Sequence, residues 1–334
     1  MTQTVVNLAS LRASPKTMRA AVLRAPRTIE IVEVPIPQPG PGQVRIRLEG
    51  CGVCASSVPP WEGRDWLKYP WEPGQPGHEG WGYIDALGPN VQGLHVGDRV
   101  TMLSSHAYAQ YDLAPADQVV CLPNTLTGQP FPGEAIGSAI NVMRRCEIHG
   151  CHRVAIIGIG FLGAILTRLA TNAGACVIAI SRRPFALEIG RMMGASCTIP
   201  MGDQWRIVEE IKAMTDGRMC EVVIEAVGKQ WPLDLAGELT GERGRLVIAG
   251  YHQDGLRQCN LQLWNWRGLD VINAHERDPR AHLCGVHAAV EMVASKKLDP
   301  RPLYTHTFPL DRLADALAMT QDRPNGFMKA LITM

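Results

Sequence analysis

Residues 153–163 read RVAIIGIGFLG, a sequence typical of a strand, a tight turn and the start of a helix. A largely apolar, strand-like run leads directly into three glycines with the spacing G-x-G-x-x-G. In a strand–turn–helix unit, the first glycine allows a tight turn and the second lets a pyrophosphate approach backbone N–H groups. The third permits close packing of helix on strand. Because a helix N-terminus favours negative charge, we predict a dinucleotide-binding turn formed by Gly158, Gly160, Phe161, Leu162 and Gly163.

The sequence around this turn alternates between strand and helix patterns. From about Cys151, short apolar strands such as CVIAIS, EVVIEAVG, RLVIAG and DVINA alternate with helical segments, which we expect at residues 161–173 and around 187–193. Strands that alternate with helices are typical of a parallel sheet covered on both faces. The fold class is therefore α/β, with a doubly wound parallel sheet in this half of the chain.

The end of the second strand indicates which dinucleotide binds. About 20 residues after the glycines, where an acidic residue would accept hydrogen bonds from the adenosine ribose, the chain reads Ser181-Arg182-Arg183. Two guanidinium groups without a carboxylate suit the 2′-phosphate of NADP(H). The residues therefore favour NADP(H) over NAD(H). In the alternative interpretation, both arginines are solvated residues of a turn that leads into a helix, and the preference stays open.

The N-terminal third has a different residue pattern. From Met18 to about Gly133, short β-rich runs such as MRAAVL, TIEIVEV and QVRIRLEG are separated by Pro and Gly clusters, which predicts mostly antiparallel structure. Residues 1–17 are expected to be a flexible extension. The chain ends in KALITM, a strand-like run that could return to this first part.

Length and composition limit the remaining possibilities. A chain of 334 residues favours two domains. Its 33 basic and 32 acidic side chains, a net charge of +1 and no long charge runs give no indication of nucleic acid or membrane as a partner. The longest apolar stretch, residues 154–166, is too short to span a bilayer. Ten scattered cysteines without a recognisable leader peptide are expected to be mostly reduced thiols in a cytoplasmic protein.

A cysteine and a histidine before the cofactor half are candidate metal ligands. Cys54 lies in C-G-V-C-A-S-S and His78 in P-G-H-E-G-W-G, and thiolate and imidazole are typical ligands of zinc. Taken alone, the pair does not decide between a metal site and two unrelated side chains. Cys51 lies three residues before Cys54 and completes a C-x-x-C pair with it.

In combination, these motifs resemble the zinc-dependent alcohol and polyol dehydrogenase branch of the medium-chain dehydrogenase/reductase superfamily. The resemblance rests on G-V-C followed by Ser56, then G-H-E, the L-G-P-N-V…V-G-D-R-V run and the glycine pattern, in this order. It implies a GroES-like antiparallel catalytic domain at 18–140 and a Rossmann domain at 141–290. The segment 291–334 is expected to return to the catalytic domain.

The resemblance also implies a site. Cys54 and His78 would be the first two ligands of a catalytic zinc, and Glu79 a neighbouring carboxylate that can approach the metal. Within the C-x-x-C pair, the family pattern assigns ligation to Cys54 and not to Cys51. The segment GEAIGSAINVMRR (133–145) is similar to the polyol-dehydrogenase version of the family, which makes Glu134 the candidate third ligand. Alternatively, Glu134 is an acid that complements a helix dipole. Ser56 would accept the proton of the substrate hydroxyl, and Ser138 would be a hydroxyl on the nicotinamide side.

Two departures from the family pattern limit these expectations. Many relatives bind a second, structural zinc through four closely spaced cysteines, but between Val100 and Pro132 this chain has only Cys121, so one zinc per subunit is expected. Ser57 replaces an aspartate that supports the histidine ligand, and Pro59 stands where some relatives have a proton-relay histidine. The proton route is therefore open.

The expected activity is hydride transfer between NAD(P) and a small secondary alcohol or polyol, or its ketone or aldehyde, with zinc as Lewis acid. A homo-oligomer, either dimer or tetramer, is expected from the resemblance. Two alternatives remain: a zinc-free medium-chain reductase of quinones or enones, and a non-catalytic nucleotide-binding protein. The joint presence of Cys54, His78 and Glu134 argues against both.

Overall fold

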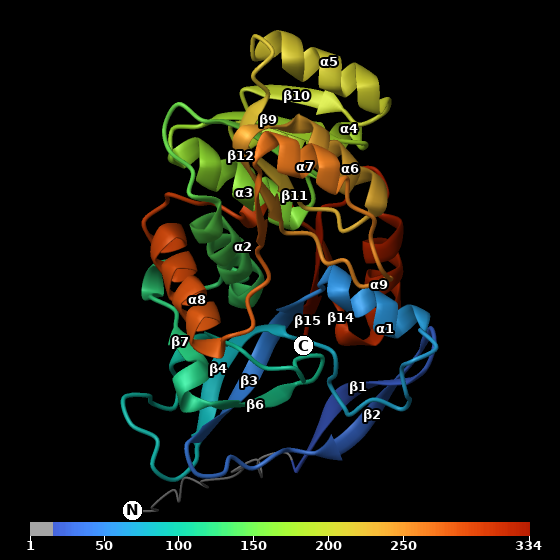
Figure 1. Ribbon diagram of the computed structural model, residues 1–334. Coiled ribbons are helices and arrows are strands. Elements are labelled where there is room, and N and C mark those ends of the chain that lie inside the picture. The colour runs from blue at the N-terminus through green and yellow to red at the C-terminus, as the bar shows by residue number, and fades with distance from the viewer. Residues whose placement is uncertain (1–15) are drawn as a thin grey trace, which may run out of the picture.

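The computed structural model of this chain describes residues 16–334. The prediction of an extension at residues 1–17 therefore falls almost wholly outside the described residues. Figure 1 shows two layered units, with a parallel sheet and its helices above and a set of mainly antiparallel strands below. None of the helices in residues 16–334 has the length and apolar character required to cross a membrane.

The upper unit contains a six-stranded parallel sheet with the strand order β10-β9-β8-β11-β12-β13. This order confirms the predicted doubly wound sheet. The strands are β8 (Arg153–Ile157), β9 (Cys176–Ser181), β10 (Cys197–Pro200), β11 (Cys220–Glu225), β12 (Thr240–Ile248) and β13 (Asp270–Asn273). The intervening helices are α3 (Phe161–Asn172), α4 (Pro184–Met192), α5 (Gln204–Met214), α6 (Gln230–Leu239) and α7 (Leu261–Arg267).

Both faces of this sheet are buried, as the sequence of β8 requires. Successive side chains of a strand point to opposite faces. Ile156 belongs to the hydrophobic cluster that contains α3, whereas Ile157 belongs to the cluster that contains α5 and α6. The run of apolar residues before Gly158 therefore reflects a central strand covered on both sides.

The lower unit is a seven-stranded sheet with the order β14-β15-β3-β4-β5-β7, in which β6 also pairs with β3, and a separate hairpin of β1 and β2. All pairs except β14–β15 are antiparallel. The strands are β1 (Thr17–Ala25), β2 (Thr28–Pro35), β3 (Gln43–Gly52), β4 (Glu79–Leu87), β5 (Arg99–Met102), β6 (Tyr111–Pro115), β7 (Val119–Cys121), β14 (Tyr304–Pro309) and β15 (Lys329–Thr333).

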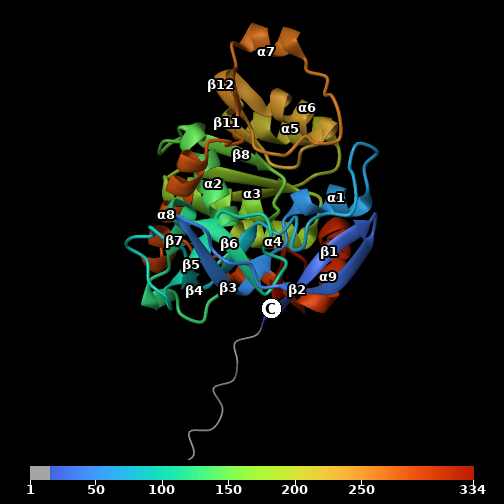
Figure 2. The same ribbon diagram turned by 90° about the horizontal axis from the view of Figure 1, so that it is seen from below.

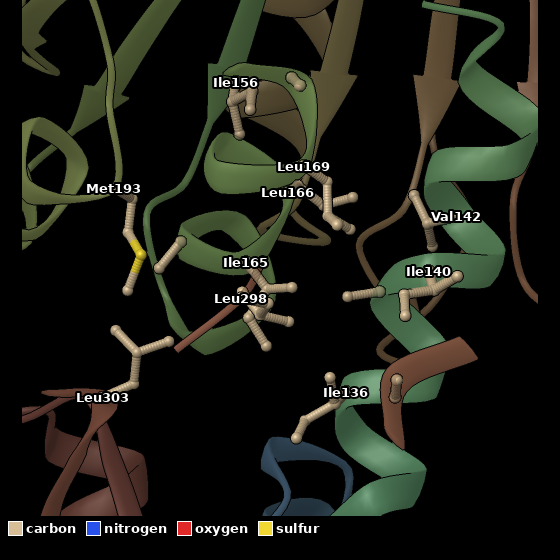
Figure 3. Packing of buried hydrophobic residues seen from close by; sticks show 14 of the residues in the cluster. Ile136, Ile140, Val142, Ile156, Ile165, Leu166, Leu169, Met193, Leu298 and Leu303 are labelled. Atoms are coloured by element: carbon tan, nitrogen blue, oxygen red, sulfur yellow. The ribbon is translucent and has the colours of Figure 1, made fainter. Parts of the chain in front are cut away.

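Two helices join the units. Helix α2 (Gly133–Cys146) packs closely on α8 (Pro279–Ala294): an added Cβ on Gly137 would lie 2.7 Å from the Val286 nitrogen, so a larger residue would push the helices apart. On its other side, α2 faces α3 through apolar side chains that include Ile140 and Leu166, as Figure 3 shows. The first turn of α2, which carries Glu134, is thus held in a fixed position between the two sheets.

The C-terminal segment returns to the lower unit. β15 pairs antiparallel with β3, so that Leu331 lies opposite Gly52. Helix α9 (Leu313–Asp322) lies beside the short helix α1 (Val58–Glu62) and the β1–β2 hairpin (Figure 2), and Arg27 donates a hydrogen bond to Gln321. The end of the chain therefore lies next to the strand that leads to Cys54.

Candidate active site

Three possible metal ligands meet where β3 ends and β4 begins. Cys54 follows β3 and caps the short 3-10 turn Ala55–Ser57, His78 precedes β4, and Glu79 is the first residue of β4. The antiparallel register places Gly52 opposite Glu79, which brings the two motifs together although 24 positions separate Cys54 from His78. One ligand atom from each of the three residues lies within 4.8 Å of the other two.

A backbone carbonyl orients the imidazole of His78. Its Nδ1 lies 2.8 Å from the carbonyl oxygen of Pro76, so Nδ1–H donates to that carbonyl and Nε2 is the ring atom that would face a metal. Nε2 points toward Ser56 Oγ at 3.4 Å, and the same hydroxyl lies 3.1 Å from Cys54 Sγ. The carbonyl of Pro76 thus provides the support expected from an aspartate at position 57. Ser57 is buried and contacts Tyr108 instead.

Acidic groups surround the imidazole of His78. Burial disfavours a charged His78, but the neighbouring Cys54, followed by Glu134 and Glu79, raises the pKa of His78 to about 10. A divalent cation bound between these side chains would be stabilised by the same groups.

Glu79 is held by a buried lysine that the sequence analysis did not identify. Lys329 Nζ lies 2.6 Å from Glu79 Oε1, and the two side chains are 5% and 1% exposed. Gly52 makes room for this pair, because an added Cβ would lie 1.8 Å from Glu79 Oε2. Lys329 Nζ also lies 4.7 Å from the ring centre of Phe161, the first residue of α3. The pair therefore connects the metal motif to the predicted cofactor turn.

Glu134 lies next to this group but makes other contacts. Its Oε1 accepts a hydrogen bond of 3.1 Å from Ser138 and lies 3.1 Å from His282 Nε2. Burial favours the neutral acid, but the hydrogen bond from His282 and the charge of His78 hold the pKa of Glu134 below its usual range. Ser138 lies one turn after Glu134, as expected. The role of Glu134 as a third ligand stays a prediction.

The predicted cofactor turn has the geometry that each glycine was expected to provide. Gly158 has φ +98°, and an added Cβ on Gly163 would lie 2.1 Å from the Gly158 oxygen. An added Cβ on Gly160 would meet nothing within 4 Å, which leaves open space beside the turn. No side chain caps α3, so the N–H groups of Phe161 and Leu162 are available to a phosphate.

The end of β9 presents the predicted arginines. Ser181 is buried, and Arg182 is exposed. Arg183 donates a hydrogen bond to the carbonyl oxygen of Phe327, in the turn before β15. The two side chains therefore have different surroundings, although both follow the strand where an adenosine ribose is expected.

A thiolate, an imidazole and a carboxylate within 4.8 Å of one another are suitable ligands for zinc. In residues 16–334 this is the one group of three such side chains within that distance. Cys51 does not join it: its thiol donates to the Gly52 carbonyl oxygen at 3.3 Å, and burial raises its pKa well above the usual range. The donor set thus fits a catalytic zinc.

Comparison with known proteins identifies the family. Residues 40–164 match the alcohol dehydrogenase GroES-like domain, and residues 162–280 match the zinc-binding dehydrogenase domain. An alcohol dehydrogenase of Geobacillus stearothermophilus is 30% identical over 64% of this chain and 72% of its own length. The chain belongs to the zinc-dependent medium-chain dehydrogenase family. The alcohol and polyol dehydrogenase branch of this family was predicted from the sequence, and it is confirmed.

Two further relatives match nearly the whole chain. A sorbitol dehydrogenase of Bacillus subtilis is 25% identical over 95% of this chain and 98% of its own length. The crystal structure of a putative zinc-binding dehydrogenase from Sinorhizobium meliloti, bound to NADP, superposes with a TM-score of 0.83. It is 23% identical and covers 96% of this chain and 100% of its own. The fold of this medium-chain dehydrogenase is therefore the one expected from its motifs.

Sequence reasoning missed two residues that the fold brings to the site: His282 on α8 and Lys329 on β15. Only Lys329 left a signal in the sequence. It is a lone charge at the start of an apolar strand, and a buried charge requires a partner.

Proposed function

We propose that this chain is a zinc-dependent oxidoreductase that transfers hydride between NAD(P) and a small secondary alcohol or polyol, or the corresponding ketone or aldehyde. The observation that supports this most strongly is the convergence of Cys54, His78 and Glu79 beside the glycine turn. The sorbitol and alcohol dehydrogenases among the relatives support the same substrate class. A zinc-free reductase would have no use for these three donors.

Cys54 and His78 would hold one zinc, with Glu79 or Glu134 as the carboxylate partner. When bound, the metal supplies Lewis-acid polarisation of the substrate oxygen. Ser56 is placed to take the substrate proton, because its hydroxyl lies between Cys54 Sγ and His78 Nε2. Lys329 pairs with Glu79 and fixes the position of its carboxylate group.

We further propose that the cofactor is NADP(H) rather than NAD(H). In support, Arg182 is exposed at the end of β9 and no acid occupies that position. The test compares kcat/KM for NADP⁺ and NAD⁺ before and after Arg182→Ala. We expect the preference for NADP⁺ to fall at least tenfold with the loss of one charge-assisted phosphate contact. An unchanged ratio would contradict the assignment.

A homo-oligomer formed through the cofactor domain is also proposed. Among the described residues, strand β13 has one neighbour in its sheet, β12, so its outer edge is free to pair with a second copy. The adjacent helix α7 exposes Trp266 over 85% of its surface and Leu261 over 67%. Exposed aromatic and aliphatic side chains beside a free strand edge are typical of subunit contacts.

The substrate is best sought by screening activity against secondary alcohols, polyols and their ketones with both cofactors. We expect turnover with small secondary alcohols or polyols. If no alcohol or ketone in the panel is turned over by the zinc-loaded protein with either cofactor, the proposed function fails. Turnover of quinones or enones by metal-free protein would support the zinc-free reductase instead.

A further inference from the structure

A buried carboxylate lies at the carboxyl end of β11. Glu225 is the last residue of this strand, and its side chain is fully buried. Its Oε1 accepts hydrogen bonds from the backbone N–H groups of Val227 at 2.7 Å and Gly228 at 2.8 Å, and its Oε2 lies 2.9 Å from Nε2 of His252. A buried carboxylate is costly unless hydrogen bonds of this kind surround it. The loop after β11 is therefore folded around this one side chain.

His252 connects Glu225 to an arginine in the next loop. Arg257 Nε lies 2.9 Å from Nδ1 of His252. Because a guanidinium group can only donate, Nδ1 must accept, so Nε2 carries the hydrogen and donates it to Glu225. Arg257 Nη2 also donates to the carbonyl oxygen of Gly228 at 3.0 Å. The three side chains thus form one hydrogen-bonded chain between the loop after β11 and the loop 249–260, which follows β12.

The backbone of Glu225 binds the second loop as well. Its carbonyl oxygen accepts hydrogen bonds from the N–H groups of Ala249 and Gly250, both at 2.8 Å. The carboxylate approaches this backbone so closely that an added Cβ on Gly250 would lie 2.6 Å from Glu225 Oε2. The relative position of the two loops therefore depends on this one residue.

The loop after β11 also touches the glycine turn. Strands β11 and β8 are neighbours, with Glu225 opposite Ile157, and the N–H of Ala226 donates to the Ile157 carbonyl oxygen at 2.9 Å. An added Cβ on Gly158 would lie 2.4 Å from Val227 Cγ2. A dinucleotide lies along the carboxyl edge of such a sheet, with its pyrophosphate at the glycine turn. Adenosine is expected at β9, on one side of β8, so the nicotinamide riboside would lie on the other side, at the loops after β11 and β12.

We propose that Glu225, His252 and Arg257 are positioning residues for hydride transfer, because their hydrogen-bonded chain fixes the two loops beside which the nicotinamide would lie. This inference rests on the proposed function and adds residues that neither the glycine turn nor the metal motif contains. The polar atoms of Glu225 and His252 bind each other and the loops, so the two side chains act through the loops and not on the reacting atoms. A displacement of about 1 Å between reacting atoms can cost about a hundredfold in rate, so loops held in this way affect kcat.

The test compares Glu225→Gln with the matched control Glu221→Gln. Glutamine has the size of glutamate, but every orientation of its amide leaves an N–H₂ group facing a donor, either the loop N–H groups or Nε2–H of His252. A change of tautomer at His252 would only move the conflict to Arg257. Glu221 lies on the same strand, at the end away from the glycine turn, where it pairs with Arg153. A second variant, Arg257→Ala, breaks the chain at its other end.

Three quantities are measured on the zinc-loaded protein. They are amide hydrogen exchange of residues 226–228 without dinucleotide, the dissociation constant of NADPH and NADH by fluorescence, and kcat with its primary deuterium isotope effect. We expect Glu225→Gln to speed exchange at least about tenfold, to weaken dinucleotide binding about threefold to tenfold and to lower kcat about tenfold to a hundredfold. The isotope effect should rise and the KM of the alcohol should stay within about threefold. Glu221→Gln should change exchange, binding and kcat by no more than about twofold.

The isotope effect separates positioning from a loss of stability, since a variant that is only less stable keeps the isotope effect of the parent protein. Equal exchange, kcat and isotope effect in Glu225→Gln and Glu221→Gln would overturn the inference. Faster exchange with unchanged kcat would overturn it too, because the loops would then be held without consequence for hydride transfer. If Glu225→Gln does not fold, the same measurements on Arg257→Ala decide, with an expected loss in kcat of about threefold to tenfold.

Failure of the proposed function gives a different result. In that case the parent protein turns over no alcohol or ketone with either dinucleotide. Binding then still tests the chain, because Glu225→Gln should weaken NADPH or NADH at least about threefold relative to Glu221→Gln. Equal binding by the two variants would overturn the inference in this case also.

Discussion

The buried pair of Glu79 and Lys329 provides the sharpest prediction for stability. The two side chains are 1% and 5% exposed, so each charge depends on the other for compensation. Removing one partner of a buried ion pair typically costs about 3–5 kcal/mol, because the remaining charge stays in the protein interior. Replacing both partners by neutral groups of similar size costs much less. We therefore expect Lys329→Met and Glu79→Gln each to be severely destabilising, and the double variant to be less so than the sum of the two.

The assay is equilibrium urea unfolding of the parent protein and these three variants, all treated with a chelator so that metal occupancy is the same. Tryptophan fluorescence and circular dichroism must give coincident transitions before free energies of unfolding are compared. The double-mutant cycle then gives the coupling energy of the pair, which we expect to be at least about 2 kcal/mol. A cost below about 1 kcal/mol for Lys329→Met, or strictly additive costs, would show that the two charges do not depend on each other.

Gly52→Ala tests the same pair by a different route. Its new Cβ would lie 1.8 Å from Glu79 Oε2, so it must displace the carboxylate from Lys329. We expect a loss of about 1–3 kcal/mol in the parent protein, and a smaller loss in the Glu79→Ala background, where the colliding atoms are absent. Equal losses in the two backgrounds would show that the close approach at Gly52 is not to this carboxylate.

Three further predictions concern the cofactor domain. Gly163→Ala should lower Tm because its new Cβ would lie 2.1 Å from the backbone oxygen of Gly158. Gly160→Ala, whose Cβ meets nothing within 4 Å, should leave Tm unchanged but weaken dinucleotide binding. Equal effects of the two substitutions on Tm and on binding would contradict the assigned roles. Burial raises the pKa of Glu221, but hydrogen bonds from Arg153 lower it from 4.5 to about 2. Its stabilisation is therefore complete above pH 4.5 and lost as pH falls toward 2. Because solvent screens the side chain of Glu221, which is 37% exposed, its ion pair should contribute about 1 kcal/mol. This contribution is measured as the pH-dependent difference in the free energy of unfolding between the parent protein and Glu221→Gln. Trp266→Glu should convert the oligomer to monomer in light scattering without lowering Tm, and an unchanged mass would exclude α7 from the interface.

The parts of the fold that were predictable from the sequence are those that depend on local pattern. The apolar run before Gly158 and the glycine spacing specify a central strand, a turn and a helix start, and all three were found. Cys54 and His78 were recognisable because each lies in a short sequence motif in which few residue types are allowed. In these cases the physical requirement acts on residues close together in the chain.

The residues that were missed depend on long-range pairing. Lys329 meets Glu79 across 250 positions, and His282 meets Ser138 across 144. No local pattern in one sequence predicts which distant side chain will compensate a buried charge. The hydrogen bond from His78 to the carbonyl oxygen of Pro76 was missed for a related reason. Every residue type at position 76 would supply the same backbone carbonyl, so the sequence does not reveal it.

Metal content measured together with activity tests whether Cys54 and His78 hold a zinc on which hydride transfer depends. We predict about one zinc per chain in the purified protein. Zinc and dehydrogenase activity should both be lost in Cys54→Ser, and both retained in the control Cys121→Ser, whose cysteine is exposed on β7. Full activity in Cys54→Ser without zinc would show that hydride transfer does not depend on a metal at this site.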